Sequence, residues 1–160
     1  MRLSRNRNCA ATTFAASIVA VALATLGPSL ALAVDTVTSK DAPDLTSVRA
    51  NIKAKDYQAA LTQLKVLADT HQHADVYSLM GFSLRKTGDY ATALTFYKKA
   101  LDFDANHKGA REYLGELYVE TGDLPKAHEQ LAVLVKLCPQ SCDEREDLEK
   151  ALASAAPKTN

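Results

Sequence analysis

The sequence has no excess charge of either sign and no extreme of composition. Lys and Arg total 19, Asp and Glu total 19, and the formal net charge is +0 at pH 7. A general nucleic-acid-binding protein has a basic surface, so this class is not expected. Apolar residues make up 47% and charged residues 24%, which excludes a wholly disordered or collagen-like chain. The length of 160 residues fits one domain.

The local motifs of common enzyme active sites are also missing. The sequence has no Gly-x-Ser-x-Gly segment, no Gly-rich phosphate-binding loop and no His-Glu-x-x-His pair. His71 and His73 have no thiol or carboxylate at the spacing of a zinc site, so we expect a solvated loop there. His107 and His128 stand alone and are expected on the surface or in loops. We therefore expect no enzymatic activity, no bound metal and no cofactor.

One long apolar run is present, near the N-terminus. A basic start with three arginines precedes an apolar run over residues 10–26, which a Gly-Pro pair interrupts. The run is shorter than the ~20 residues that a membrane-spanning helix needs. The small-residue pattern Ala31-Leu32-Ala33 follows. These features are typical of a secretory signal peptide over residues 1–33. We expect cleavage after Ala33, no membrane anchor in the mature protein, and a periplasmic or secreted location.

The rest of the sequence repeats with a period of 34 residues. Within residues 74–87 the apolar side chains recur at the spacing of one helix face. A glycine then supplies a left-handed helix stop, and the aspartate after it caps the next helix. Such a period indicates stacked helix hairpins. The pairs at this spacing are Gly81 and Gly115, Gly88 and Gly122, Asp89 and Asp123, and Ala93 and Ala127.

These residues resemble the tetratricopeptide repeat (TPR) family. The resemblance covers residues 74–107 and 108–141, and the second copy ends in Pro139 as the family pattern does. It implies an all-α fold of antiparallel helix hairpins stacked as a short solenoid. The sequence departs from the family pattern at Arg111, Leu134 and Ala105. The first copy carries the pattern at Tyr77, Met80, Gly81, Leu84, Ala93, Tyr97 and Ala100.

The repeats predict the organisation of the whole chain. A degenerate copy over residues 44–73 precedes the two full ones, since residues 55–61 parallel residues 88–94. Ser141-x-x-Glu144 is a capping box, which predicts a C-terminal capping helix over residues 142–156. We thus expect a TPR domain over residues 44–156. Residues 34–43 form a flexible N-terminal segment in this interpretation, and residues 157–160 form a tail.

Cys138 and Cys142 are the cysteines that remain after signal cleavage. Three residues separate the two cysteines. In the common type of redox enzyme, two residues separate the cysteines, and the pair lies at a helix N-terminus. A structural disulfide that holds the turn after the last hairpin is the favoured interpretation. An accessory redox or enzyme-associated role for the pair is the alternative. The segment also resembles the C-terminal third of short exported bacterial TPR proteins with a similar Cys-x-x-x-Cys.

The family resemblance predicts a binding surface. TPR proteins generally bind peptides or partner proteins on the concave face formed by the first helix of each hairpin, which we call the first-helix face. The Lys/Asn set with which many TPR proteins hold peptide carboxylates is absent. By family register, the first-helix face carries Asp75, Ser78, Phe82, Arg85, Lys86, Gly109, Glu112, Glu116, Val119 and Glu120.

Three glutamates of this face, Glu112, Glu116 and Glu120, follow one another at intervals of four residues and form an acidic stripe. We expect Phe82 to be an exposed apolar anchor beside the stripe, with Arg85 and the neighbouring lysine at its edge. The predicted function is a non-catalytic scaffold that binds a basic or amphipathic protein or peptide. The alternative for the stripe is a merely solvated acidic face.

Overall fold

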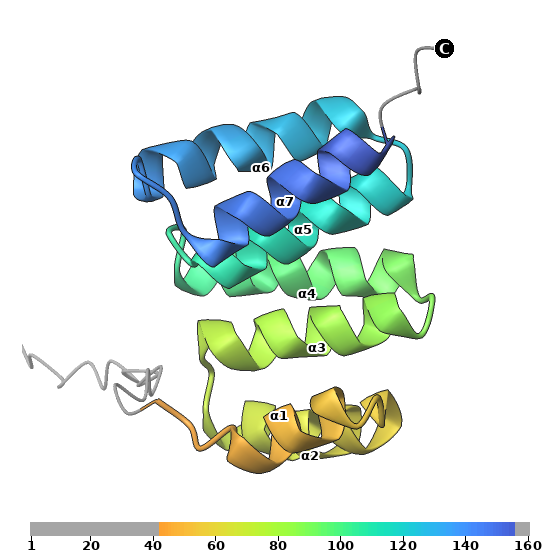
Figure 1. Ribbon diagram of the computed structural model, residues 1–160. Coiled ribbons are helices and arrows are strands. Elements are labelled where there is room, and N and C mark those ends of the chain that lie inside the picture. Colours follow the sequence, from red (N-terminus) through yellow and green to blue (C-terminus); the bar gives the residue numbers. More distant parts are fainter. Residues whose placement is uncertain (1–41, 156–160) are drawn as a thin grey trace, which may run out of the picture. The chain divides into compact units, whose positions relative to one another are not determined.

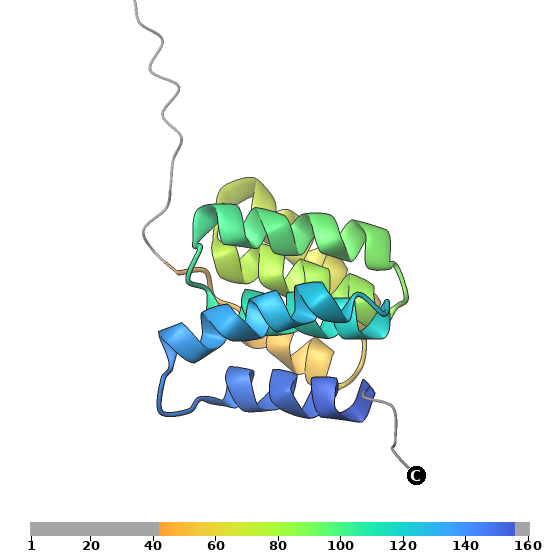
Figure 2. The same cartoon turned by 90° about the horizontal axis from the view of Figure 1, so that it is seen from above.

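The computed structural model describes residues 42–155, which form seven α-helices and no strand within that range. The helices follow one another as three antiparallel hairpins, and α7 packs beside α5 and α6 (Figures 1 and 2). The predicted all-α fold is confirmed. The helices are α1 (Thr46–Lys53), α2 (Tyr57–Thr70), α3 (Ala74–Lys86), α4 (Tyr90–Phe103), α5 (Lys108–Glu120), α6 (Leu124–Leu137) and α7 (Asp143–Ala155).

Some sequence-based predictions fall outside the described residues. These are the signal peptide over residues 1–33, most of the segment over residues 34–43, and the tail over residues 157–160. Among the helices that the structure describes, none combines the length and the hydropathy needed to cross a membrane.

Glycine and aspartate set the turn inside each full hairpin. Gly88 and Gly122 adopt left-handed φ angles of 86° and 81°, as the repeat pattern predicts. Asp89 and Asp123 then accept hydrogen bonds from the backbone N–H three residues further on, at 3.1 and 3.3 Å. The glycine found at the repeat spacing therefore ends one helix, and the aspartate after it caps the next.

The degenerate hairpin makes the same turn with less suitable residues. Lys55 takes the glycine position and has a φ of 62°, which a residue with a Cβ rarely adopts. Asp56 still caps α2 by accepting from the backbone N–H of Ala59 at 3.0 Å. The turn geometry is thus retained although the glycine is lost.

The hairpins bury two apolar clusters that meet through Leu84 and Leu101, which pack against both. The shared residues make the core continuous from one repeat to the next, as stacked repeats require. The first cluster comprises Leu45, Val48, Ala60, Leu61, Leu64, Val76, Tyr77, Leu79, Met80, Ala100 and Ala110. The second comprises Ala93, Tyr97, Leu114, Leu117, Tyr118, Ala127, Leu134, Leu148 and Leu152.

Two glycines of the repeat lie where another side chain comes close. A Cβ added at Gly81 would lie 2.6 Å from the ring of Tyr97 on α4. A Cβ added at Gly115 would lie 2.5 Å from Leu148 Cδ2 on α7. The close approach at Gly115 is therefore to a side chain of the capping helix.

Arg111 stands where the family pattern has a large apolar residue, and it makes polar contacts instead. Its guanidinium donates to the Ala105 carbonyl at 2.9 Å and to Gln130 Oε1 at 2.8 Å. The side chain therefore connects the loop before α5 with α6, so this departure from the pattern preserves the contact between the two helices.

The C-terminal helix is held by a turn that contains both cysteines. The sulfur atoms of Cys138 and Cys142 are 2.11 Å apart, so the pair is at bonding distance. The Ser141 hydroxyl donates to the Glu146 carboxylate at 2.6 Å, so the predicted capping box between Ser141 and Glu144 is wrong. The helix is instead anchored by apolar burial, mainly of Leu148.

Candidate functional site

The residues predicted for the first-helix face differ widely in exposure. Lys86 and Glu120 are exposed, while three are buried: Ser78, Arg85 and Glu112. The face is thus more than a row of solvated side chains, because buried polar and charged groups cost free energy unless they are paired. The remaining residues of this face are half-buried: Asp75, Phe82, Gly109, Glu116 and Val119.

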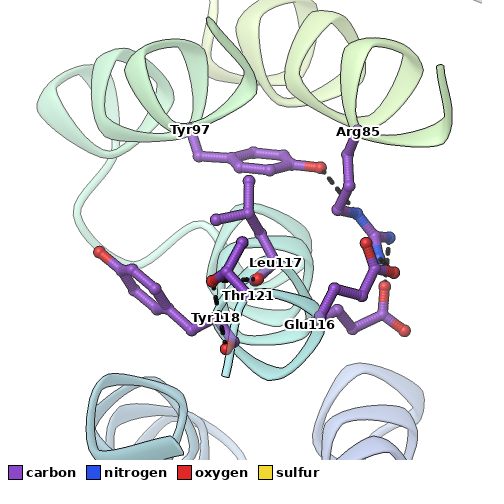
Figure 3. Close-up of polar contacts among 7 residues, drawn as sticks. Arg85, Tyr97, Glu116, Leu117, Tyr118 and Thr121 are labelled. Atoms are coloured by element: carbon purple, nitrogen blue, oxygen red, sulfur yellow. Dashed lines mark hydrogen bonds and ion pairs between the residues drawn. The ribbon is translucent and has the colours of Figure 1, made fainter. Parts of the chain in front are cut away.

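Arg85 is the most buried charge of this face, and the prediction that it lies at the edge is wrong. Only 2% of the residue is exposed. Its Nε donates to the Tyr97 hydroxyl at 3.3 Å, Nη1 donates to Glu120 Oε1 at 2.5 Å, and Nη2 donates to Glu116 (Figure 3). Two carboxylates and a hydroxyl therefore compensate for the loss of water around the guanidinium.

The electrostatics of this network keep its groups in their usual charge states. Burial acts against the charge on Arg85, but Tyr97 and the two glutamates raise the pKa of its guanidinium overall. Burial raises the pKa of the Tyr97 hydroxyl well above its ordinary value. The hydroxyl therefore stays neutral and the guanidinium stays charged at any physiological pH.

Phe82 is the centre of three half-buried aromatic side chains, which we call the aromatic row. Its ring centroid lies 6.3 Å from that of Tyr57 and 4.9 Å from that of Tyr113. Phe82 is predicted to be exposed but is half-buried, because these two rings cover part of it. The guanidinium of Arg85 lies 5.6 Å from the Phe82 centroid, and the ammonium of Lys86 lies 5.3 Å from it. Cations therefore contact the aromatic row.

The acidic stripe is divided into two parts by its contacts. Glu116 and Glu120 are both paired with Arg85. Glu112 is 8% exposed and makes no hydrogen bond or ion pair through its side chain with the described residues. Burial raises its pKa to about 8, and the nearby carboxylates of Glu116 and α7 contribute. The stripe is therefore not a continuous row of ionised glutamates.

A small cavity lies beside Glu112 and is lined by residues of the three first helices, α1, α3 and α5, and of the capping helix α7. Its volume is about 180 Å³. Ser78 lines it, and the Ser78 hydroxyl is buried with no hydrogen-bond partner among the described residues. We call this space the Glu112 pocket. Its lining residues are Arg49, Asp75, Ser78, Leu79, His107, Gly109, Glu112, Tyr113 and Glu144.

His107 has a structural role that the sequence interpretation misses. It lies in the loop before α5, in line with the expectation of a surface or loop residue, but it is half-buried and caps α5 by accepting from the backbone N–H of Ala110 at 2.9 Å. Its Nε2 bonds Asp75 at 3.0 Å. His73 caps α3 by the same use of Nδ1. The two histidines are one 34-residue period apart, so the repeat itself could have predicted the shared role.

The described residues contain no group of three or more metal-binding side chains. The predicted sites thus separate into three places: the Arg85 network, the aromatic row and the Glu112 pocket. The first helices contribute to all three places, together with Tyr97 of α4 and Tyr57 of α2, and the cysteine pair lies in the turn before α7.

Known proteins resemble this chain in its repeats and in its fold. Residues 84–145 match the model of the tetratricopeptide repeat family. Among solved structures, the chain is similar to the type III secretion translocator chaperone SycD of Yersinia enterocolitica, with a TM-score of 0.60 and 17% identity. The match covers 71% of this chain and 90% of that chain, and identity this low supports the fold alone. Comparison with curated protein sequences gives no match. The resemblance to the tetratricopeptide repeat that the sequence pattern predicts is therefore confirmed over residues 84–145.

Proposed function

We propose that this protein is a non-catalytic scaffold that binds a protein or peptide partner on its first-helix face. The observation that carries the proposal is the aromatic row of Tyr57, Phe82 and Tyr113, which lies partly open on that face. Aromatic side chains offer large contact areas at low entropic cost and are enriched in protein interfaces. Stacked helical repeats use the same face for partners.

The similarity in fold supports a protein partner. One solved structure that resembles this chain is that of a translocator chaperone. A chaperone acts on other proteins, and a chain with the same arrangement of hairpins is suited to the same general task. The particular partner of this chain is not implied by that likeness.

The partner is proposed to be basic or amphipathic. Glu116 and Glu120 together carry one more charge than Arg85 neutralises, and Glu112 adds a further carboxyl. The aromatic row supplies apolar contact next to these carboxyls. Apolar burial then provides most of the affinity, while the acidic groups favour basic partners and make association weaken with salt.

We further propose that the partner is met outside the cytoplasm, because the N-terminal sequence is typical of an exported protein. The intact mass of the protein purified from its producing cells tests this. The proposal requires a mature N-terminus at Val34 or within a residue or two of it. Retention of residues 1–33 would contradict it.

The binding face can be tested by crosslinking in cells. A photoreactive amino acid at Lys86 lies on the first-helix face beside Phe82, and the same amino acid at Val66, which is 66% exposed on α2, is the matched control. The proposal predicts a discrete crosslinked protein from position 86 that is absent from position 66. The same products from both positions, or none from position 86, would contradict it.

A further inference from the structure

Asp75 and Glu144 of the Glu112 pocket each lie near groups that stabilise their charge. Arg49 acts on Asp75 and helps to lower its pKa, after the larger effect of the hydrogen bond from His107. Lys108 Nζ lies 3.8 Å from Glu144. His107 Nδ1 accepts from the backbone N–H of Ala110, and its Nε2 bonds Asp75. The carboxyl of Glu112 makes no ion pair or hydrogen bond with the described residues.

The groups that face Glu112 come from three helices. Glu116 lies on its own helix, Glu144 and Asp147 approach from α7, and Arg85 approaches from α3. Arg85 is already paired with Glu116 and Glu120, so its charge is shared. The surroundings of Glu112 therefore disfavour its ionised form and would favour it if one more positive charge entered.

The uncharged part of the pocket also points to a ligand. The Ser78 hydroxyl, on a residue only 2% exposed, lines the pocket without a hydrogen-bond partner in the described part of the chain. Buried hydroxyls are rarely left in that state. The volume of about 180 Å³ is below the range of about 300–1,000 Å³ that is usual for small-molecule sites, and suits a single side chain.

We propose that the Glu112 pocket receives one lysine or arginine side chain of the partner protein, whose cationic group pairs with Glu112 and donates to Ser78. This inference rests on the proposed function, since it identifies a residue type that the partner must present to the first-helix face. The aromatic row lies next to the pocket through Tyr113, which belongs to both. The partner segment therefore presents an apolar residue to Phe82 and a basic residue to Glu112.

Binding of the cation also moves a proton. The raised pKa of Glu112, about 8, keeps most of this carboxyl protonated at neutral pH in the free protein. When the basic side chain enters, the carboxyl ionises and its proton passes to solvent. Affinity for a basic segment therefore rises between pH 6.5 and pH 8.5, whereas affinity for a neutral segment does not.

Selection of peptides from a random displayed library tests the inference and does not require the partner to be identified first. The baits are the wild-type protein, Glu112→Gln, and Glu129→Gln as a matched control, because Glu129 is exposed on α6. Wild type and Glu129→Gln are expected to select peptides with a lysine or arginine at a fixed distance from an apolar residue. Glutamine resembles the protonated carboxyl, so Glu112→Gln should remain folded.

The selected peptides are then synthesised with the basic residue and with a neutral analogue, norleucine for lysine or citrulline for arginine. At pH 8.5 the neutral analogue should bind wild type at least about tenfold more weakly. On Glu112→Gln the two peptides should bind alike. A basic peptide that binds both proteins equally, or a neutral analogue that loses nothing on wild type, would overturn the inference.

Two further outcomes separate this inference from the proposed function. Suppose that Phe82→Ala weakens the binding of the selected peptides, but that the binding of none of them depends on a basic residue. The proposed function then stands and the inference is wrong. If no selected peptide is weakened by Phe82→Ala or Glu112→Gln, both are wrong. Free butylammonium that binds wild type as tightly as the peptide does would show a small-amine site instead, and would also overturn the inference.

Discussion

Arg85 of α3 and Tyr97 of α4 meet inside one hairpin, where the guanidinium Nε donates a 3.3 Å hydrogen bond to the tyrosine hydroxyl. The Tyr97 ring is fully buried and occupies the space that the missing side chain of Gly81 leaves. The guanidinium continues to Glu116 and Glu120 on α5. One side chain therefore connects the core of the first full repeat with the first helix of the next.

Removal of this charge should destabilise the protein. Arg85→Met keeps the length of the side chain but leaves both glutamates and the Tyr97 hydroxyl without their donor. We expect a loss of about 1–3 kcal/mol in the free energy of unfolding. This is less than the ~3–5 kcal/mol of a fully buried pair, because the two carboxylates are partly exposed. Urea denaturation measures it. Lys86→Met, an exposed neighbour, should change stability by no more than about 0.5 kcal/mol, and equal losses for both would mean that the network adds nothing.

The contact between Gly115 and Leu148 should be sensitive to a single methyl group. Gly115→Ala places a Cβ 2.5 Å from Leu148 Cδ2, so the buried Leu148 side chain or α7 has to shift, at a cost of about 1–3 kcal/mol. Gly109→Ala is the matched control in the same helix, where the nearest atom is a His107 ring carbon at 3.5 Å. That variant should be neutral or more stable by up to about 1 kcal/mol. If Gly115→Ala were as stable as the control, α7 would not pack as described.

Stability should fall with pH because of Glu112. Its pKa rises from 4.5 to about 8 on folding, so the folded state binds the proton more tightly between these values. Its contribution is therefore complete below about pH 4.5 and is lost as the pH rises through about 8. One pKa unit is worth about 1.4 kcal/mol, so even a fraction of the shift lowers the melting temperature by several degrees.

The difference in melting temperature between wild type and Glu112→Gln isolates this residue from the other titrating groups. Glutamine keeps the volume and has no proton to lose, so the melting temperature of wild type should fall relative to that of the variant from pH 5 to pH 8.5. A difference that is constant over this range would show that Glu112 is ionised at neutral pH in the folded protein.

The cysteine pair should be a structural feature and not a redox centre. A loop closed over three intervening residues removes little unfolded-state entropy, so Cys138→Ser with Cys142→Ser should cost about 0–2 kcal/mol. Thiol titration of the protein from its native compartment should find no free thiol at these positions. Turnover of a disulfide substrate by wild type, abolished in the double variant, would favour the accessory redox role instead.

The repeat and its turns could be predicted because the signals are local. Gly88 and Asp89 act on the backbone within a few residues, and the same pair returns at Gly122 and Asp123. The family register likewise assigns residues to the first-helix face, since a helix face follows from spacing alone. The departure at Arg111 does not disturb the fold because its polar contacts replace an apolar one.

The exposure of the site residues could not be predicted in the same way. Glu112 and Glu116 belong to one stripe, yet α7 covers the first while Arg85 reaches the second. Which glutamate is paired depends on the length and direction of a side chain from another repeat. The contacts of Phe82 likewise depend on Tyr57 and Tyr113, which come from two different hairpins. Periodicity contains no information on such contacts.

The most direct test of the central claim is amide hydrogen exchange of the protein with and without its bound partner segment. We predict slower exchange on binding in α3 and α5, around Phe82 and Glu112, with little change in α4 and α6. Glu112→Gln should reduce the protection around the pocket and leave that around Phe82. Protection confined to α2, α4 and α6 would contradict the account, because the partner would then bind the outer helices and not the first-helix face.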